Sequence, residues 1–104
     1  MIYLMATLDV IPDKMGEFVE FLEKEGVPLF DRFGLKLVGS WTTTVGTMNQ
    51  VVDLWACESL EHFGRAMTAM VRDPEFRKLD SKLRTITTSE TTKLLWPLPC
   101  SPMR

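Results

Sequence analysis

The spacing between apolar residues switches repeatedly along this chain between the two-residue repeat of a strand and the longer repeat of a helix. Residues 2–11 alternate apolar and mixed positions, which predicts a strand with one strongly apolar face. Between residues 14 and 33 the apolar side chains recur instead on one side of a helix, with charged side chains opposite. The same analysis predicts strands over residues 35–44 and 51–57, a helix over 60–72 that restarts at 74, and a last strand over 85–95.

Glycine, proline and capping residues mark the ends and breaks of these helices. Gly26 and Pro28 predict a kink near residues 24–26, because proline lacks the backbone N–H that a helix requires. Gly34 is expected to end the first helix, and Ser59 to cap the second. Asp73 followed by Pro74 predicts a break, with Asp73 capping the restarted helix.

The order strand, helix, strand, strand, helix, strand defines the fold class. It predicts an α+β protein with the ferredoxin-like β-α-β-β-α-β plait, a four-stranded antiparallel sheet with helices on one face, and the second helix broken at Asp73-Pro74. The second sheet face is then bare, which predicts a homodimer that forms an α+β barrel. We expect a single domain over residues 1–96 and an extended, proline-rich tail over residues 97–104.

Charge and motif content exclude several functions. The 104 residues include 12 Lys and Arg and 14 Asp and Glu, which gives a net charge of -2. The basic residues are scattered along the chain. This argues against a nucleic-acid partner. A glycine-rich phosphate loop, a nucleophile elbow and a His or Cys pair at metal-ligand spacing are absent from the sequence, so no metal and no cofactor is predicted.

The cysteines and the lengths of the apolar segments predict the cellular compartment. The first ten residues lack the basic start and the uninterrupted apolar core of a signal peptide, and no stretch is long enough to span a membrane. Cys57 and Cys100 are expected to be reduced thiols, which predicts a cytoplasmic location.

The hairpin over residues 39–55 concentrates the residue types best suited to ligand binding. Trp41 and Trp55, on neighbouring strands, could flank a flat apolar molecule, and Asn49 lies in the turn between them. The alternative is that both tryptophans belong to the core or to the dimer interface. Simple alternation places Trp41 on the same strand face as Leu35 and Leu37, while the register between the two strands stays open.

Four further polar residues are candidates for a site. Asp9 and Asp53 each interrupt an apolar strand, and either carboxylate would have a raised pKa and could act as a general acid or base in a closed pocket. The alternative is that they lie at a polar sheet edge or pair with Lys or Arg across the barrel. His62 is the sole histidine, but it lies away from the apolar stripe of its helix, and the Tyr3 hydroxyl could reach either a pocket or an interface.

The central run of the sequence resembles a known family. Residues 39–63, GSWTTTVGTMNQVVDLWACESLEHF, are similar to the NIPSNAP signature, in which Gly, Trp, Gly, Asn, Val and a second Trp follow in this order. PDKMGEF after the first strand, DPEF at residues 73–76 and the terminal LLWPLPCSP resemble the ends of the same family. The resemblance implies a dimeric α+β barrel, similar in fold to cofactor-free monooxygenases, muconolactone isomerases and heme-degrading enzymes, and does not specify a reaction.

Two kinds of function follow from these expectations. The first is a homodimer that binds a small apolar or aromatic molecule between sheet and helices, with or without cofactor-free oxygenase or isomerase activity. The second is a non-enzymatic interaction module whose apolar face serves assembly. An active site of the first kind requires a cavity of roughly 300 Å³ or more that contains Asp9, Asp53, Asn49, Tyr3 or His62.

Overall fold

A computed structural model describes residues 1–103 of the chain, and its sheet has the predicted plait topology. Four antiparallel strands follow the order β2-β3-β1-β4. The elements in chain order are β1 (Ile2–Val10), α1 (Met15–Phe21), the π-helical turn η1 (Leu22–Gly26), α2 (Val27–Arg32), β2 (Lys36–Thr42), β3 (Gln50–Cys57), α3 (Leu60–Arg72), α4 (Pro74–Ile86) and β4 (Thr87–Leu95).

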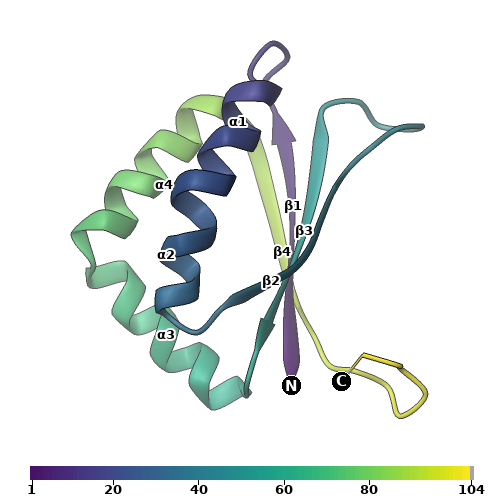
Figure 1. Ribbon diagram of the computed structural model, residues 1–104, viewed down its shortest axis with the longest axis vertical. Coiled ribbons are helices and arrows are strands. Elements are labelled where there is room, and N and C mark those ends of the chain that lie inside the picture. Colours follow the sequence, from purple (N-terminus) through teal and green to yellow (C-terminus); the bar gives the residue numbers. More distant parts are fainter. Residues whose placement is uncertain (104) are drawn as a thin grey trace.

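All helices cover the same face of the sheet, and the opposite face has no layer of its own (Figure 1). On β1 the even-numbered residues point to the helices, and all five of them are buried. On β3 the odd-numbered residues do so, from Val51 to Cys57. The core therefore lies between the sheet and the helices, where apolar surface from both layers is removed from water.

The break in the first helix takes the form of a π-helical turn. Pro28 has no N–H to donate to the carbonyl of Lys24, and its ring would clash with that carbonyl in a regular helix. The chain widens there, and the N–H of Val27 donates to the carbonyl of Leu22, five residues earlier. The predicted kink near residues 24–26 thus falls in η1, and the apolar stripe continues into α2.

The second helix is broken where the sequence predicts, but α4 runs further than expected. Ser59 Oγ accepts from the backbone N–H of His62, and the carboxylate of Asp73 accepts from the N–H groups of Glu75 and Phe76. The last strand was expected from residue 85, whereas α4 continues to Ile86. The reason is that Ile86, 1% exposed, extends the buried helical stripe of α4 into the core.

An irregularity in β2 corrects the predicted face of Trp41. Leu37 lies opposite Trp55, but the next pair joins Gly39 to Leu54, so Val38 is an extra residue. Beyond this bulge every side chain of β2 changes face, and the expectation that Trp41 shares a face with Leu37 is wrong. Trp41 lies opposite Val52 on the uncovered face and is 57% exposed.

The segment after β4 leaves the sheet on the side away from the helices (Figure 1). Trp96 and Leu98 are 75% and 67% exposed. The N–H of Ser101 donates to the carbonyl of Leu98, so a turn interrupts the extended conformation that the prolines predict.

Candidate functional site

A mostly apolar cavity of about 170 Å³ lies between the sheet and the helices. Its lining is contributed by β1, β3 and β4 below and by every helical segment above. The lining residues are Leu4, Ala6, Leu8, Phe18, Phe21, Leu22, Gly26, Phe30, Asp53, Trp55, Met67, Met70, Phe76, Leu79, Leu83, Glu90 and Thr92. This helix–sheet cavity is smaller than the roughly 300 Å³ expected of an active site, so it can accommodate a molecule of about one ring.

The strand register places the polar groups of the cavity around a small residue. Ala6 on β1 lies opposite Asp53 on β3 and opposite Thr92 on β4. Glu90 lies opposite Leu8, one step along the same face. Because alanine fills little space, the floor of the cavity is open beside Asp53.

Aromatic rings form one side of the cavity. Phe30 on α2 lies 4.6 Å from Trp55 between ring centroids, with the rings tilted by 46°. Phe76 on α4 lies 6.3 Å from the Phe30 ring. Trp55 is 2% exposed. These tilted contacts fix the rings, and the apolar faces they present suit a flat ligand.

Asp53 is the buried polar residue of this core, with 3% of its surface exposed. Ser40 Oγ donates to its Oδ1 oxygen at 2.6 Å. Burial raises the pKa of the Asp53 carboxyl, and the hydrogen bond from Ser40 opposes that rise. The side chain is therefore a hydrogen-bond acceptor at the cavity wall that takes up a proton more readily than an exposed aspartate.

Glu90 connects the cavity to the surface. It is exposed and, with Leu83, lines both the cavity and a polar groove of about 430 Å³ between α4 and β4. Desolvation over the apolar lining raises the pKa of Glu90, and the nearby Asp80 carboxylate adds to the rise. Sequence reasoning missed this residue, because it read residues 85–95 as a polar strand without assigning Glu90 to the helix-covered face.

Of the residues predicted for a site, the structure brings Asp53 and Trp55 together in the cavity. Tyr3, Trp41 and Asp9 lie on the other face of the sheet. Tyr3 is nevertheless 8% exposed. The two tryptophans are separated by the sheet, so they do not flank one ligand.

Asp9 belongs to a polar cluster at one end of the uncovered face. Its Oδ2 oxygen accepts from Ser89 Oγ on β4, and its Oδ1 oxygen accepts from Gln50 Nε2 on β3 at 3.1 Å. These hydrogen bonds, that of Ser89 first, lower the pKa of the Asp9 carboxyl. The group is thereby held ionised and joins three strands.

Asn49 and His62 also lie outside the cavity, and each takes part in a hydrogen bond with a backbone group. Asn49 adopts a positive φ of 57° before β3, and its carbonyl accepts from the N–H of Val10. His62 Nε2 donates to the carbonyl of Phe33 at 3.1 Å. The ring lies so close to Gly34, where φ is 83°, that a Cβ there would lie 2.3 Å from Nε2. His62 therefore connects α3 to the end of α2.

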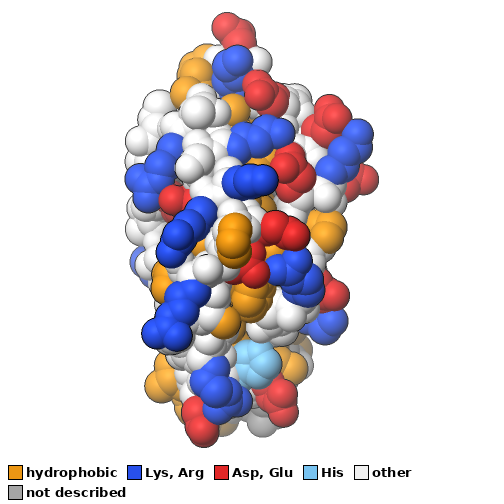
Figure 2. Space-filling model, turned by 90° about the vertical axis from the view of Figure 1, so that its left-hand side faces the viewer, with side chains coloured by type: hydrophobic (Ala, Val, Ile, Leu, Met, Phe, Trp, Pro, Cys, Tyr) orange, Lys and Arg blue, Asp and Glu red, His pale blue; other side chains and the backbone are white. Residues whose placement is uncertain are grey.

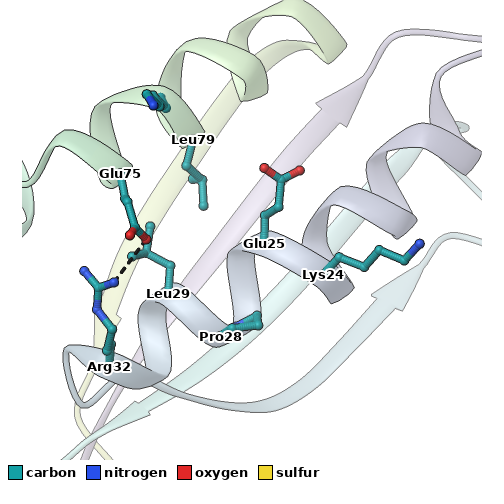
Figure 3. A pocket seen from close by; sticks show the side chains of 8 residues that line it. Lys24, Glu25, Pro28, Leu29, Arg32, Glu75 and Leu79 are labelled. Carbon is teal, nitrogen blue, oxygen red and sulfur yellow. Dashed lines mark hydrogen bonds and ion pairs between the residues drawn. The ribbon is translucent and has the colours of Figure 1, made fainter.

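A second hollow lies on the outer surface between α2 and α4 (Figure 3). Most of its charged groups are paired, since Arg32 contacts Glu75 at 3.0 Å and Asp73 at 2.9 Å, while Lys24 contacts Glu20 and Glu25 contacts Lys82. The helical surface as a whole mixes charges of both signs (Figure 2). Leu29 and Leu79 separate this groove from the interior, and it offers a ligand no unpaired cluster of one charge.

The described part of the chain has neither a metal-binding cluster nor a membrane-spanning helix. Residues 1–103 contain no group of three or more His, Cys, Asp or Glu side chains that could hold a metal ion. None of the helices in this range is both long and apolar enough to cross a membrane.

The fold and the cavity define a ferredoxin-like α+β domain with a small apolar site between its layers. The NIPSNAP family model matches residues 3–102, and the chain belongs to this family. It is 34% identical over 83 residues to Protein NipSnap from Drosophila melanogaster, an alignment that covers 75% of this chain. The chain spans about 30% of the length of that curated relative.

Solved structures share this fold. A NIPSNAP domain protein from Burkholderia xenovorans superposes with a TM-score of 0.88 at 24% identity, over 98% of this chain and 99% of that one. A NIPSNAP-like domain protein from the same organism is 29% identical, with a TM-score of 0.84 over 97% and 88% of the two chains. A putative antibiotic biosynthesis monooxygenase from Nitrosomonas europaea shares the fold, with a TM-score of 0.71 at 11% identity over 94% and 99%.

Proposed function

We propose that this NIPSNAP-family chain binds a small apolar molecule, about the size of one aromatic ring, in the helix–sheet cavity. The observation that carries the proposal is an apolar space of about 170 Å³ beside a buried carboxylate, Asp53. Protein interiors are close-packed, so a space of this size in a domain of 104 residues requires an explanation.

The volume sets the size of the ligand. An engineered protein cavity of about 150 Å³ lined by aliphatic and aromatic side chains binds benzene. The helix–sheet cavity has a similar volume and lining, with Phe30 and Trp55 on one side. Leu83 and Glu90, which it shares with the groove outside, form a route of entry.

Binding can be tested with benzene and toluene by thermal shift and by NMR titration of the backbone amides. A ligand at ten times its dissociation constant stabilises the native state by about 1.4 kcal/mol. That corresponds to a rise of roughly 5–10 °C in the melting temperature for a domain of this size. The amides that shift should belong to strands and helices around the cavity.

A matched pair of variants locates the binding site. Ala6→Val fills the floor of the cavity, whereas Ala56→Val makes the same change on the uncovered face of β3. Ala6→Val should weaken binding at least tenfold, and Ala56→Val should leave it unchanged. Equal binding by both variants would show that the ligand occupies another site.

We also propose that the chain forms a homodimer through its uncovered sheet face. Val52, Leu54 and Ala56 alternate along β3 on that face and remain partly exposed. On the same face, Trp41 on β2 is 57% exposed, and Leu95 on β4, opposite Tyr3, is 37% exposed. A second copy would remove this apolar surface from water, as the dimeric barrel that the family resemblance implies would do.

Light scattering after size-exclusion chromatography tests the dimer. The expected mass is about 24 kDa, twice the 11.9 kDa of the chain. Leu54→Lys should give a monomer, because it places a charge within the interface, and Val71→Lys on the outer side of α3 should remain dimeric. A dimer that binds no ring ligand would support a non-enzymatic interaction module instead.

Proton-transfer chemistry without a cofactor, as in an isomerase or oxygenase, is a second candidate function, although the cavity of about 170 Å³ is smaller than the roughly 300 Å³ expected from the sequence for such an active site. It is favoured by the position of Asp53, whose carboxyl has a pKa raised by burial and lines the cavity. Ligands with an acidic C–H should then exchange it for deuterium in D2O, as followed by NMR. Exchange should disappear in Asp53→Asn, and binding without exchange would leave a ligand-binding function alone.

A cytoplasmic location is part of the same proposal. Cys57 is buried and Cys100 is exposed, and neither forms a disulfide. This supports a reducing compartment, in which thiols stay free. Fractionation of cells that express the tagged chain tests the location.

A further inference from the structure

One oxygen of Asp53 is left without a partner inside the core. Its Oδ1 oxygen accepts from Ser40 Oγ, while Oδ2 accepts no hydrogen bond from any described residue. No fully buried polar atom among the described side chains lacks a partner, so Oδ2 is not sealed by neighbouring atoms. Since Asp53 is 3% exposed and lines the cavity, this oxygen opens onto the cavity.

The charge of the lining restricts what can meet that oxygen. Asp53 and Glu90 are its acidic residues, and none of its described residues is Lys, Arg or His. An anionic ligand such as an aromatic acid would face two carboxylates and no counter-charge. The cavity therefore disfavours carboxylates and phosphates, whatever the shape of their rings.

The number of free acceptors restricts the ligand further. Glu90 and Thr92, the other polar residues of the lining, are exposed, so Asp53 Oδ2 is the unpartnered acceptor in the buried part of the cavity, which Phe30, Trp55, Met67 and Met70 also line. A primary ammonium group brings three N–H donors, and at least one of them would be buried beside Asp53 without a partner, at considerable cost. A hydroxyl group brings one donor and satisfies the available oxygen.

We propose that the ligand is a neutral single-ring phenol, whose ring packs against Phe30 and Trp55 and whose hydroxyl donates to Asp53 Oδ2. This inference rests on the proposed function, because it names the class of molecule that the same cavity binds. Ser40 holds the carboxylate in place, and Ala6 leaves room beneath the ring for the hydroxyl to reach it.

The test compares four ligands of similar size: phenol, toluene, pyridine and benzoate. Titrations of the full chain at pH 7.5 should show phenol binding about 10- to 150-fold more tightly than toluene, as a hydrogen bond to a charged group provides. Benzoate should not bind. Equal binding of phenol and toluene would overturn the inference and leave the proposed function intact, whereas failure of all four ligands would overturn both.

Asp53→Asn should change the preference, because the amide oxygen can still accept from Ser40 while the NH2 group faces the cavity. The advantage of phenol over toluene should mostly disappear, and pyridine, which only accepts, should bind more tightly than it does to the unchanged chain. Asp9→Asn is the matched control on the other face and should keep the preference for phenol. An unchanged preference in Asp53→Asn contradicts the inference.

A measurement on the unchanged chain keeps the inference testable if Asp53→Asn does not fold. With the aspartate carboxyl carbons labelled with ¹³C, phenol should shift the Asp53 resonance and toluene should not. Equal shifts with both ligands, or none with either at saturation, would show that no hydroxyl contacts this carboxylate.

Discussion

The two faces of the sheet hold aspartates in opposite situations. Asp9 on β1 and Asp53 on β3 each lie between apolar neighbours in a strand, yet one points away from the helices and the other towards them. Hydrogen bonds from Ser89 and Gln50 lower the pKa of Asp9, whereas burial raises the pKa of Asp53 despite the hydrogen bond from Ser40.

This difference shows how position on a strand sets chemical character. Asp9 remains in contact with water and gains two donors, so its charge is stabilised. Asp53 is covered by helices that supply apolar side chains, and it keeps one donor. Neighbouring strands thus carry two different carboxylates: Asp9, which joins three strands through hydrogen bonds, and Asp53, which is buried at the cavity wall.

The two tryptophans provide the strongest test of the contrast between the faces. Trp55→Ala, on the covered face, should lower the free energy of unfolding by about 3–5 kcal/mol, because it removes a fully packed ring. Trp41→Ala, on the uncovered face, should cost less than about 1 kcal/mol in a monomeric background such as Leu54→Lys. Urea denaturation measures both.

That pair also depends on the bulge at Val38. Without the bulge, Trp41 would lie among the core residues and its removal would be costly. A loss above about 2 kcal/mol for Trp41→Ala in the monomer would therefore contradict the register described above.

Ser40 donates to Asp53 and Ser89 donates to Asp9, and removing these hydroxyl groups should give the next largest effects. Ser40→Ala should raise the pKa of Asp53 still further from its ordinary value, and lower the free energy of unfolding at pH 7 by roughly 1–2 kcal/mol. Ser89→Ala should raise the pKa of Asp9 back towards its ordinary value. Carboxyl ¹³C titrations measure both, and an Asp53 pKa that stays constant in Ser40→Ala would refute the pairing.

Much of the fold is readable from the sequence because its determinants are local. Ser59, Asp73 and Pro74 act on the backbone within a few residues, and the helix ends they predict are present. Pro28 and Gly26 likewise place the irregular turn η1. The end of α4 was less predictable, because Thr85 and Ile86 suit a strand locally and are helical since Ile86 enters the core.

The site was only partly predictable, because it depends on pairings between distant segments. The bulge at Val38 exists only in relation to β3, and it determines that Trp41 and Trp55 lie on different faces. Glu90 enters the cavity through the register of β4 on β1, which the sequence does not reveal. The small volume of the cavity is likewise set by how side chains from all layers fill the interior.

The pH dependence of stability should have opposite signs for the two aspartates. The raised native pKa of Asp53 means that stability falls as pH increases from about 4 through that pKa, and this fall should be smaller in Asp53→Asn, where the raised pKa of Glu90 still contributes. The lowered native pKa of Asp9 means that its contribution is present above about pH 4 and is lost as pH decreases, so Asp9→Asn should be destabilising at pH 7. Urea denaturation between pH 3 and pH 7 gives both trends, and trends of the same sign would show that the two environments do not differ as described.

The smallest effect on the free energy of unfolding is expected for the ion pairs on the outer side of the helices, which, unlike Asp53, are in contact with water. Arg32 joins α2 to α4 through Asp73 and Glu75, and all three groups are at least partly in contact with water. Arg32→Met should lower the free energy of unfolding by about 0.5 kcal/mol at low ionic strength, and by less in 1 M salt, because exposed ion pairs are weak and screened. Denaturation at the two salt concentrations measures the difference. A loss above about 2 kcal/mol, or one that salt leaves unchanged, would mean that this surface network is desolvated. Asp73 and Glu75 would then be desolvated acidic groups, as Asp53 is.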